Sequence, residues 1–322
     1  MADTTLKIAT YNVENLFDLK ESGDEYKEYR SSLSNWNQKT YKTKLKHISQ
    51  VLKDIDADIV ALQEIESLQA LKDLRFTLKQ NKLYYPYYAI ASKKNTTVKV
   101  ALLSKLPFLY AKPLQITATK KFRDILEVKF KTPQMSKPLY LFVNHWKSKS
   151  GAESQRIVSA KVLRKRVQKL GYDKNIILVG DFNSHYEEYK TFLRKRRHND
   201  TGGRTGINDV LRTKQQQIPY SCVMKQEPRS FYNLWYDKEE SQRFSYIFRG
   251  KKEALDNILI SQSLVECKGM HYIKDSIDSF DAPYLYDGKK IYRWKVRGKK
   301  HPKHKDKGYS DHLAVSAKFL VR

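Results

Sequence analysis

Short apolar runs recur along the whole chain and predict buried β-strands. The clearest spans 176–179, four apolar residues followed by Gly180, and fits a strand buried on both faces. Apolar runs or apolar–polar alternation predict the other strands, at 6–11, 58–62, 84–91, 98–104, 125–130, 139–143, 245–248, 255–260 and 313–319. Strands are therefore expected from the beginning of the chain to its end.

Between the strands, apolar residues return at helical spacing. Tyr41, Leu45, Ile48 and Leu52 share one helical face and predict a helix over 41–52. Similar spacing predicts helices over 68–83, 153–170 and 187–197, with Gly171 just past the end of the third. No Gly-, Ser- or Pro-rich linker divides the chain. The pattern indicates a single α/β domain over residues 1–322.

The net charge of the chain indicates a class of binding partner. The chain has 62 Lys and Arg against 35 Asp and Glu, a formal charge of +27, with 40% hydrophobic residues. This composition excludes a disordered tail, and the charge raises the local concentration of polyanions. Nucleic acid and anionic membrane surfaces are the candidate partners. The basic runs at 194–198 and 299–305 fit solvated charge runs and contacts to a polynucleotide backbone equally well.

Compartment remains open at this stage. Cys222 and Cys267 allow at most one disulfide and lack metal-site spacing. No apolar run approaches the ~20 residues that span a bilayer. A strand pattern beginning by Leu6 leaves no room for a signal peptide. We expect a monomer, secreted or periplasmic if a signal was trimmed and cytoplasmic otherwise.

Polar residues stand at the ends of the predicted strands. A carboxylate inside an apolar run, such as Asp256, is costly unless it is paired. Carboxylates suit Mg²⁺, and histidines flanked by carboxylates can transfer protons. The set predicts metal-assisted hydrolysis and consists of Asn12, Glu64, His145, Asp181, Asn183, Asp256, Asp311 and His312.

Six short motifs carry a resemblance to a known family. They are Tyr-Asn-Val-Glu-Asn at 11–15, Leu-Gln-Glu at 62–64, Asn-His-Trp at 144–146, Gly-Asp-Phe-Asn at 180–183, Leu-Asp-Asn-Ile-Leu at 255–259 and Ser-Asp-His at 310–312. In this order and spacing the chain resembles the endonuclease/exonuclease/phosphatase superfamily. The resemblance implies a four-layered α/β sandwich, two facing sheets flanked by helices, that hydrolyses phosphoesters with a divalent metal.

The same resemblance implies roles for individual residues. Glu64 would be the principal metal ligand, with Asn12 beside it at the metal or phosphate and Asp311 as a further ligand. Asp181 and Asn183 would orient the attacking water and the phosphate. His312, steered by Asp256, and His145 would be the catalytic histidines.

Residues near His145 are assigned in the same way. Pancreatic-type deoxyribonucleases hold this histidine with an acidic residue beside an arginine, and Arg123-Asp124 occupies the matching place. Asp124 is therefore expected to orient His145. Arg123, Lys147 and Arg156 are candidate phosphate contacts, although Lys147 and Arg156 fit solvated loop positions equally well.

The histidine pair separates branches of the superfamily. Repair exonucleases generally carry Asn where His145 stands, and the Cys- and Arg-containing signature of inositol phosphatases is absent around Asp256. Sphingomyelinases share the pair, but the chain lacks an evident apolar docking hairpin. The sequence therefore predicts a Mg²⁺- or Mn²⁺-dependent deoxyribonuclease of low sequence specificity, with Ca²⁺ as an auxiliary ion and RNA as another substrate. A lipid or small-molecule phosphodiesterase and a non-catalytic nucleic-acid-binding protein are the alternatives.

Overall fold

The computed structural model describes residues 3–93, 96–133, 135–192, 198–214, 229–266 and 269–322. Its α-helices are α1 (Gln38–Ile55), α2 (Leu68–Gln80), α3 (Glu153–Leu170) and α4 (Glu188–Thr191). Single-turn helices lie at Lys27–Tyr29, Gly206–Val210, Leu234–Asp237, Glu240–Gln242, Gln262–Leu264 and Pro283–Leu285. Cys222, Cys267 and the basic residues 194–197 lie outside the described residues.

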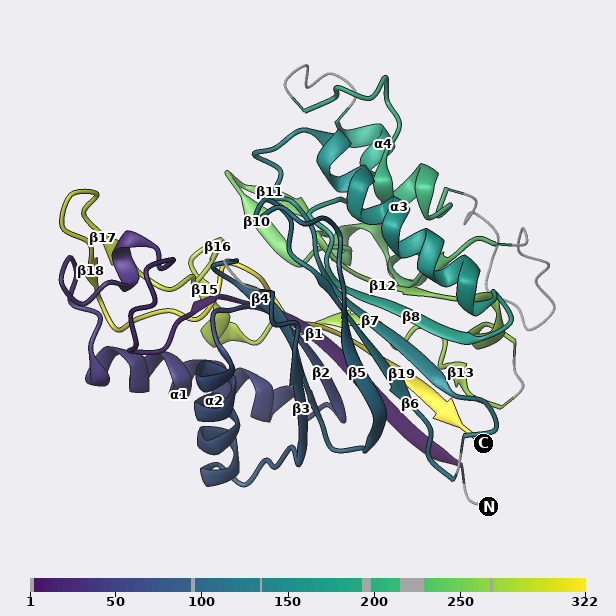
Figure 1. Ribbon diagram of the computed structural model, residues 1–322, viewed down its shortest axis with the longest axis horizontal. Helices are drawn as coiled ribbons and strands as arrows, with labels where there is room; N and C mark the ends of the chain where they lie inside the picture. Colours follow the sequence, from purple (N-terminus) through teal and green to yellow (C-terminus); the bar gives the residue numbers. More distant parts are fainter. Residues whose placement is uncertain (1–2, 94–95, 134, 193–197, 215–228, 267–268) are drawn as a thin grey trace.

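Two mixed sheets face each other (Figure 1). The first has the order β13-β19-β1-β2-β4-β3, with β14 also paired to β19. Its strands are β1 (Thr4–Leu16), β2 (Ile59–Ile65), β3 (Tyr87–Ile90), β4 (Lys99–Ser104), β13 (His271–Tyr272), β14 (Asp278–Ser279) and β19 (Val315–Val321). Parallel pairing of β1 with β2 brings Asn12 opposite Gln63, next to Glu64.

The second sheet has the order β5-β6-β7-β8-β12-β9. Its strands are β5 (Phe108–Leu114), β6 (Ile125–Phe130), β7 (Leu139–His145), β8 (Asn175–Asp181), β9 (Tyr232–Asn233) and β12 (Asp256–Ile260). Outside the two sheets stand three hairpins, formed by β10 (Tyr246–Phe248) with β11 (Lys251–Glu253), β15 (Tyr286–Asp287) with β16 (Lys290–Ile291), and β17 (Val296–Arg297) with β18 (Lys303–His304).

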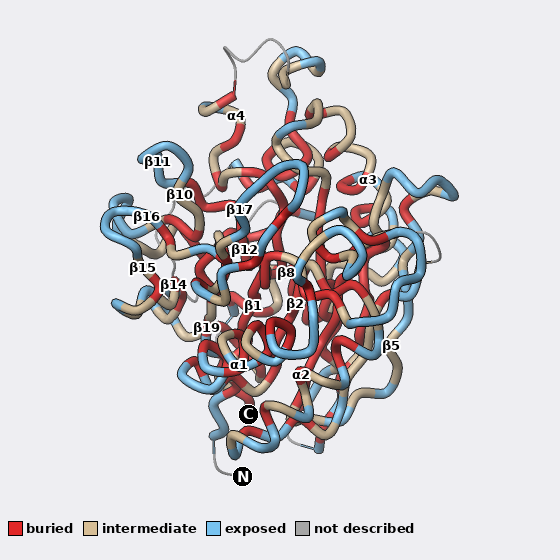
Figure 2. The backbone as a smooth tube through the Cα atoms, turned by 90° about the vertical axis from the view of Figure 1, so that its left-hand side faces the viewer, coloured by how far each residue is buried: buried red, intermediate tan, exposed pale blue. Residues whose placement is uncertain are grey.

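Alternation along the strands explains the layers. In β2, Ile59 and Ala61 face the space between the sheets, while Val60 and Leu62 pack beneath α1 and α2. In β8 the odd-numbered apolar residues face the first sheet and the even-numbered ones pack beneath α3. Both faces of each sheet are therefore covered, which is why these strands are almost continuously apolar. Figure 2 shows the buried strands enclosed by exposed loops, and the predicted four-layered sandwich is confirmed.

Element boundaries match the predictions best for the helices with clear signals. Asn37 starts α1 because its side chain accepts the N–H groups of Lys39 and Thr40, and Asp56 ends it in a left-handed conformation. The helix over 153–170 matches its prediction. Of the helix predicted over 187–197, only 188–191 is helical among the described residues.

Strand β5 was not predicted. It stands at the edge of the second sheet and contains Pro113. Proline has no N–H to donate to a neighbouring strand, so a segment that contains it is not predicted as a strand, although proline is tolerated at the edge of a sheet. A candidate membrane-spanning helix is not found in the part of the chain that the structure describes.

Candidate active site

The polar residues predicted at strand ends meet at one edge of the two sheets. His145 ends β7 opposite Asp181 at the end of β8, and Asp181 is in turn opposite Asp256 at the start of β12. His145 and Asp181, with Asn12, Glu64, Asn183, Asp311 and His312, line a cavity of about 590 Å³, and Asp256 lies buried behind His312. The sandwich thus places side chains from both sheets around one space.

Gly180 allows β7 and β8 to approach closely at this edge. Its φ is 135°, and a Cβ there would lie 2.1 Å from the carbonyl oxygen of Asn144. A larger residue would separate the strands directly beneath His145 and Asp181. The close approach of the two strands therefore requires glycine at the first position of the Gly-Asp-Phe-Asn motif.

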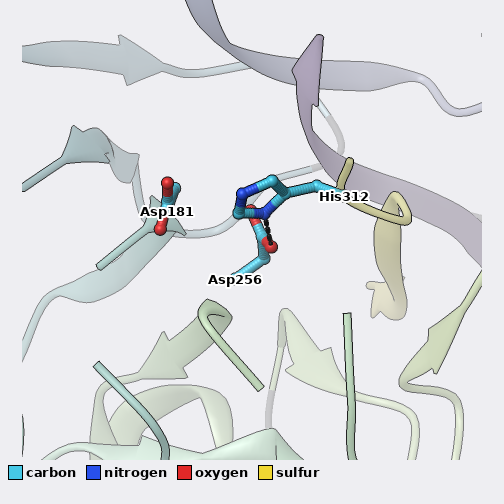
Figure 3. A group of neighbouring side chains, drawn as sticks. All are labelled: Asp181, Asp256 and His312. Carbon is cyan, nitrogen blue, oxygen red and sulfur yellow. Dashed lines mark hydrogen bonds and ion pairs between the residues drawn. The ribbon is translucent and has the colours of Figure 1, made fainter. Parts of the chain in front are cut away.

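Asp256 and His312 form a buried pair. His312 Nδ1 lies 2.7 Å from Asp256 Oδ2, which also accepts the Ser245 hydroxyl at 2.6 Å. Burial alone would lower the pKa of His312, but the carboxylates of Asp256, Asp181 and Asp311 raise it well above its usual value. His312 is therefore an imidazolium at neutral pH, held in orientation by Asp256 (Figure 3).

Asp181 lies beside the same imidazole (Figure 3) and is held by N–H donors. Its Oδ1 accepts the Asn183 backbone N–H, and its Oδ2 accepts the side-chain amides of Asn183 at 3.0 Å and Asn12 at 3.1 Å. Burial raises the pKa of Asp181, opposed by the charge of His312. The carboxylate is thus oriented and more basic than an exposed aspartate.

His145 lies on the other side of Asp181. Its Nε2 is 3.5 Å from Asp181 Oδ2 and 3.8 Å from Glu64 Oε1. Burial, with the nearby charges of Arg123 and His312, lowers the pKa of His145 well below its usual value. His145 is therefore neutral where His312 is charged.

The predicted partnership of Asp124 with His145 is wrong. Asp124 Oδ1 accepts the Ile116 backbone N–H at 3.2 Å and faces Lys93 Nζ at 3.4 Å. His145 Nδ1 is buried and has no hydrogen-bond partner among the described residues. The reason is that the Lys93 ammonium, enclosed by the loops before β6, turns the carboxylate toward itself.

Glu64 and Asp311 form a pair of carboxylates suited to a divalent cation. Glu64 adopts a left-handed backbone conformation, φ 68°, which is costly for this residue type and recurs at functional sites. Burial and then the Asp311 charge raise the pKa of Glu64. Two carboxylates that line one cavity and repel each other supply the oxygen ligands that Mg²⁺ or Mn²⁺ prefers.

Asn12 is oriented as a donor in this arrangement. Its Oδ1 accepts the Glu14 N–H at 3.0 Å, which fixes the amide, and its nitrogen faces Glu64 and Asp181. The Asn12 amide nitrogen thus lies between the carboxylates of Glu64 and Asp181 and donates to both. The place of Asn12 at the metal or phosphate stays a prediction, because an amide oxygen that accepts one N–H keeps a second lone pair.

A second cluster of possible ligand atoms consists of Asp181, Asp256 and His312. In this cluster His312 Nδ1 and Asp256 Oδ2 are already bound to each other at 2.7 Å, so these two atoms are not open to a cation. Glu64 and Asp311 are therefore the better cation site.

The three predicted phosphate contacts have different positions. Arg123 lines the cavity and donates to the Trp146 carbonyl. Lys147 does not line it. Arg156 is buried, paired with Glu153 at 2.6 Å, and donates to the carbonyls of the 147–151 loop. Arg156 therefore fixes the loop after His145, and because it also lines the cavity, its contact with substrate stays a prediction.

Several cavity residues were missed by the sequence reasoning. Lys149 bridges Glu188 and Glu253, each at 2.9 Å, and so ties the loop after β7 to α4 and β11. Arg293 contacts Glu14 and lies 3.4 Å from Asp311 Oδ2. Of these residues, only Glu14 could have been singled out from the sequence, because it belongs to the motif at 11–15. The others are brought to the site by contacts between distant segments, which the sequence pattern does not report.

Comparisons with known proteins agree with this geometry. The model of the Endonuclease/Exonuclease/phosphatase family matches residues 7–320. A similar solved structure is TDP2 from D. rerio complexed with single-strand DNA product, at 16% identity and TM-score 0.59, covering 98% of this chain and 99% of that one. No curated protein matches the sequence.

Two structures from Bacteroides thetaiotaomicron are also similar. One is an endonuclease/exonuclease/phosphatase family protein, at 14% identity and TM-score 0.59, covering 100% of this chain and 99% of that chain. The other is a mannosyl-6-phosphatase, at 14% identity and TM-score 0.56, covering 98% and 99%. At such identities these similarities establish the fold alone.

Proposed function

Since the chain belongs to the endonuclease/exonuclease/phosphatase family, whose members hydrolyse phosphoester bonds, we propose that it is a divalent-metal-dependent phosphodiesterase. Its proposed substrate is DNA, cleaved internally with little sequence specificity. The observation that carries the proposal is the pair of histidines on either side of Asp181, with His145 Nε2 at 3.5 Å from Asp181 Oδ2 and His312 Nδ1 at 2.7 Å from Asp256 Oδ2 (Figure 3).

The difference in protonation between the two histidines assigns the proton transfers. Neutral His145, with Nε2 beside Asp181, accepts a proton from the attacking water as its oxygen bonds to phosphorus. Protonated His312 donates its proton to the oxygen whose bond to phosphorus breaks. The proton gained and the proton given balance, and solvent restores both histidines.

The carboxylates and amides hold this arrangement. Asp181 orients the water beside His145, and the Asn183 amide keeps Asp181 in place. Asp256 keeps His312 protonated until it donates. A divalent cation held by Glu64 and Asp311 would neutralise charge on the scissile phosphate.

The choice of a polynucleotide rests on charge. A formal charge of +27 attracts a polyanion through contacts that do not read base sequence. The TDP2 structure with a DNA product shows that this fold accommodates DNA in that protein. RNA, a phospholipid and a phosphate monoester are the competing substrates. The monoester is included because one protein of similar fold is a mannosyl-6-phosphatase.

Nicking of supercoiled plasmid tests the proposal. We expect nicking with Mg²⁺ or Mn²⁺, none with EDTA, and a loss of about 10³-fold or more in His312→Ala. His271→Gln is the matched control because His271 lies on β13, away from the cavity. Well-folded protein that leaves plasmid, linear DNA and RNA intact but cleaves a lipid or monoester would refute the choice of DNA.

A further inference from the structure

Residues 293–308 form a strongly basic hairpin, named here the basic arm. These sixteen residues contain eight Lys or Arg and one acid, Asp306. The arm contains β17 and β18 and extends beyond α1 at the left of Figure 1. Its cations are concentrated on one projecting element of the molecule.

A buried anchor holds the basic arm to the domain. His304 is 3% exposed, accepts the Trp294 indole N–H at 2.8 Å through Nδ1, and reaches the Glu28 carbonyl at 2.6 Å through Nε2. Its backbone exchanges two hydrogen bonds with the Asn35 side chain. The rings of Tyr29 and Trp36 also pack against His304. The arm is therefore a fixed element, whereas a charge run that is merely solvated needs no such anchor.

The root of the basic arm joins the active-site cavity. Arg293 donates to Glu14, the Trp294 backbone N–H donates to Glu14 Oε2 at 3.0 Å, and Arg293 also faces Asp311. A Cβ at Gly308 would lie 1.9 Å from the Arg293 carbonyl oxygen, so the two ends of the arm meet closely. The arm therefore begins beside a proposed cation ligand.

Apart from Arg293, which is paired with Glu14 and Asp311, and Lys295, the cations on the basic arm can bind an external anion. Lys295 is paired with Asp287. Within the described part of the chain, no carboxylate lies within 4.0 Å of the exposed cations Arg297, Lys299, Lys300, Lys303 and Lys305. Clustered like charges repel one another, and contact with a polyanion relieves this cost.

We propose that the basic arm is a second binding surface, which holds the phosphate backbone of DNA several nucleotides from the scissile phosphate on the Asp311 side of the cavity. The inference rests on the proposed function for its substrate. A rigid display of cations binds with a smaller loss of conformational entropy than a mobile tail. A long polynucleotide engages both the cavity and the arm, whereas a small phosphodiester reaches only the cavity.

The test replaces four arm cations together, with Lys299→Gln, Lys300→Gln, Lys303→Gln and Lys305→Gln. The control carries the same number of neutralised, exposed helix lysines that do not line the cavity, with Lys53→Gln, Lys72→Gln, Lys79→Gln and Lys169→Gln. Fluorescence anisotropy with a labelled 30-base-pair duplex in EDTA measures binding without cleavage. We expect the arm variant to bind at least about tenfold more weakly than the control, with a salt slope that is shallower by about 0.9 for each DNA phosphate that the arm no longer neutralises.

Hydrolysis of bis-p-nitrophenyl phosphate with Mn²⁺ separates the two proposals. The arm variant is expected to hydrolyse this small diester at the wild-type rate. Equal DNA binding by arm variant and control would overturn the inference, as would arm-dependent binding to phosphatidylserine vesicles without arm-dependent DNA binding. Failure of wild-type protein to hydrolyse any diester would refute the proposed function, and the anisotropy comparison would still decide whether the arm binds DNA.

Discussion

At the scale of single residues, two histidines of the same type receive opposite protonation states from their surroundings. Burial, together with the nearby charges of Arg123 and His312, lowers the pKa of His145. His312 is equally buried, but the carboxylates around it outweigh the effect of burial. The neighbours of each ring therefore decide which histidine accepts a proton and which donates one.

The Asp256→Asn variant tests the carboxylate's hold on His312. Removing the negative charge lowers the pKa of His312, so less imidazolium is present at neutral pH. We expect turnover of DNA to fall by about 10² or more. NMR titration of the His312 ring in metal-free protein should show a lower pKa than in wild type, and an unchanged pKa would contradict the assignment.

The raised pKa of His312 also links stability to pH. Folding favours its protonated form, and this stabilisation is fully present below the unfolded-state pKa of about 6.5 and is lost as pH rises through the folded pKa. Between those limits, the free energy of unfolding of Asp256→Asn should depend less on pH than that of wild type. Urea unfolding at a series of pH values makes the comparison.

Glu64→Gln tests the proposed cation site independently of turnover. The substitution removes one charge of the Glu64–Asp311 pair, so the metal-free protein loses a repulsion and also a ligand. Excess Mn²⁺ should raise the Tm of wild type, because it binds only the folded state, and should leave the Tm of the variant nearly unchanged. The same Mn²⁺-dependent rise in both proteins would place the ion elsewhere.

At the scale of elements, the active-site edge depends on how the loop after β7 is held. Arg156 on α3 pairs with Glu153 and donates to the loop carbonyls, while Lys149 in the loop bridges Glu188 and Glu253. These ion pairs join α3, α4 and β11 around the loop that follows His145. Lys149 and Arg156 therefore hold the loop after His145 in position, and both also line the cavity.

Arg156→Met should destabilise the fold, because Glu153 is fully buried and would lose its partner. Breaking such a pair costs about 3 kcal/mol or more of the free energy of unfolding. Urea denaturation measures the loss, with Lys161→Met, an exposed residue of the same helix, as control. A normal stability with a raised KM for DNA would instead assign Arg156 to substrate binding.

At the scale of the whole molecule, the positive charge is expected to govern binding of a long substrate. Cations bound to phosphates release counterions, so affinity falls with rising salt. The KM for plasmid should rise steeply between 50 and 200 mM NaCl, by about 10-fold or more, whereas the KM for bis-p-nitrophenyl phosphate should change little. A salt-insensitive KM for plasmid would show that charge is not the source of affinity.

The sequence by itself determined the layers and the candidate site. Apolar residues on both faces of β2 and β8 require cover on both sides, and covering two such sheets gives the four-layered sandwich. The places of Asn12, Glu64, His145 and Asp181 at strand ends were read from the sequence, whereas their convergence was implied only by the family resemblance. Strand pairing joins them two by two, and the packing of the two sheets joins the pairs.

Only the tertiary structure decided the partners of these side chains. Asp124 is adjacent to the predicted Arg123 but binds Lys93, and His304 is anchored by Asn35 across 269 positions of sequence. Periodicity reports which face of an element is buried, but it carries no information about which distant side chain occupies the same space. Proton assignments, the anchoring of the basic arm and the fixing of the 147–151 loop depend on such contacts, and they follow from the packed structure.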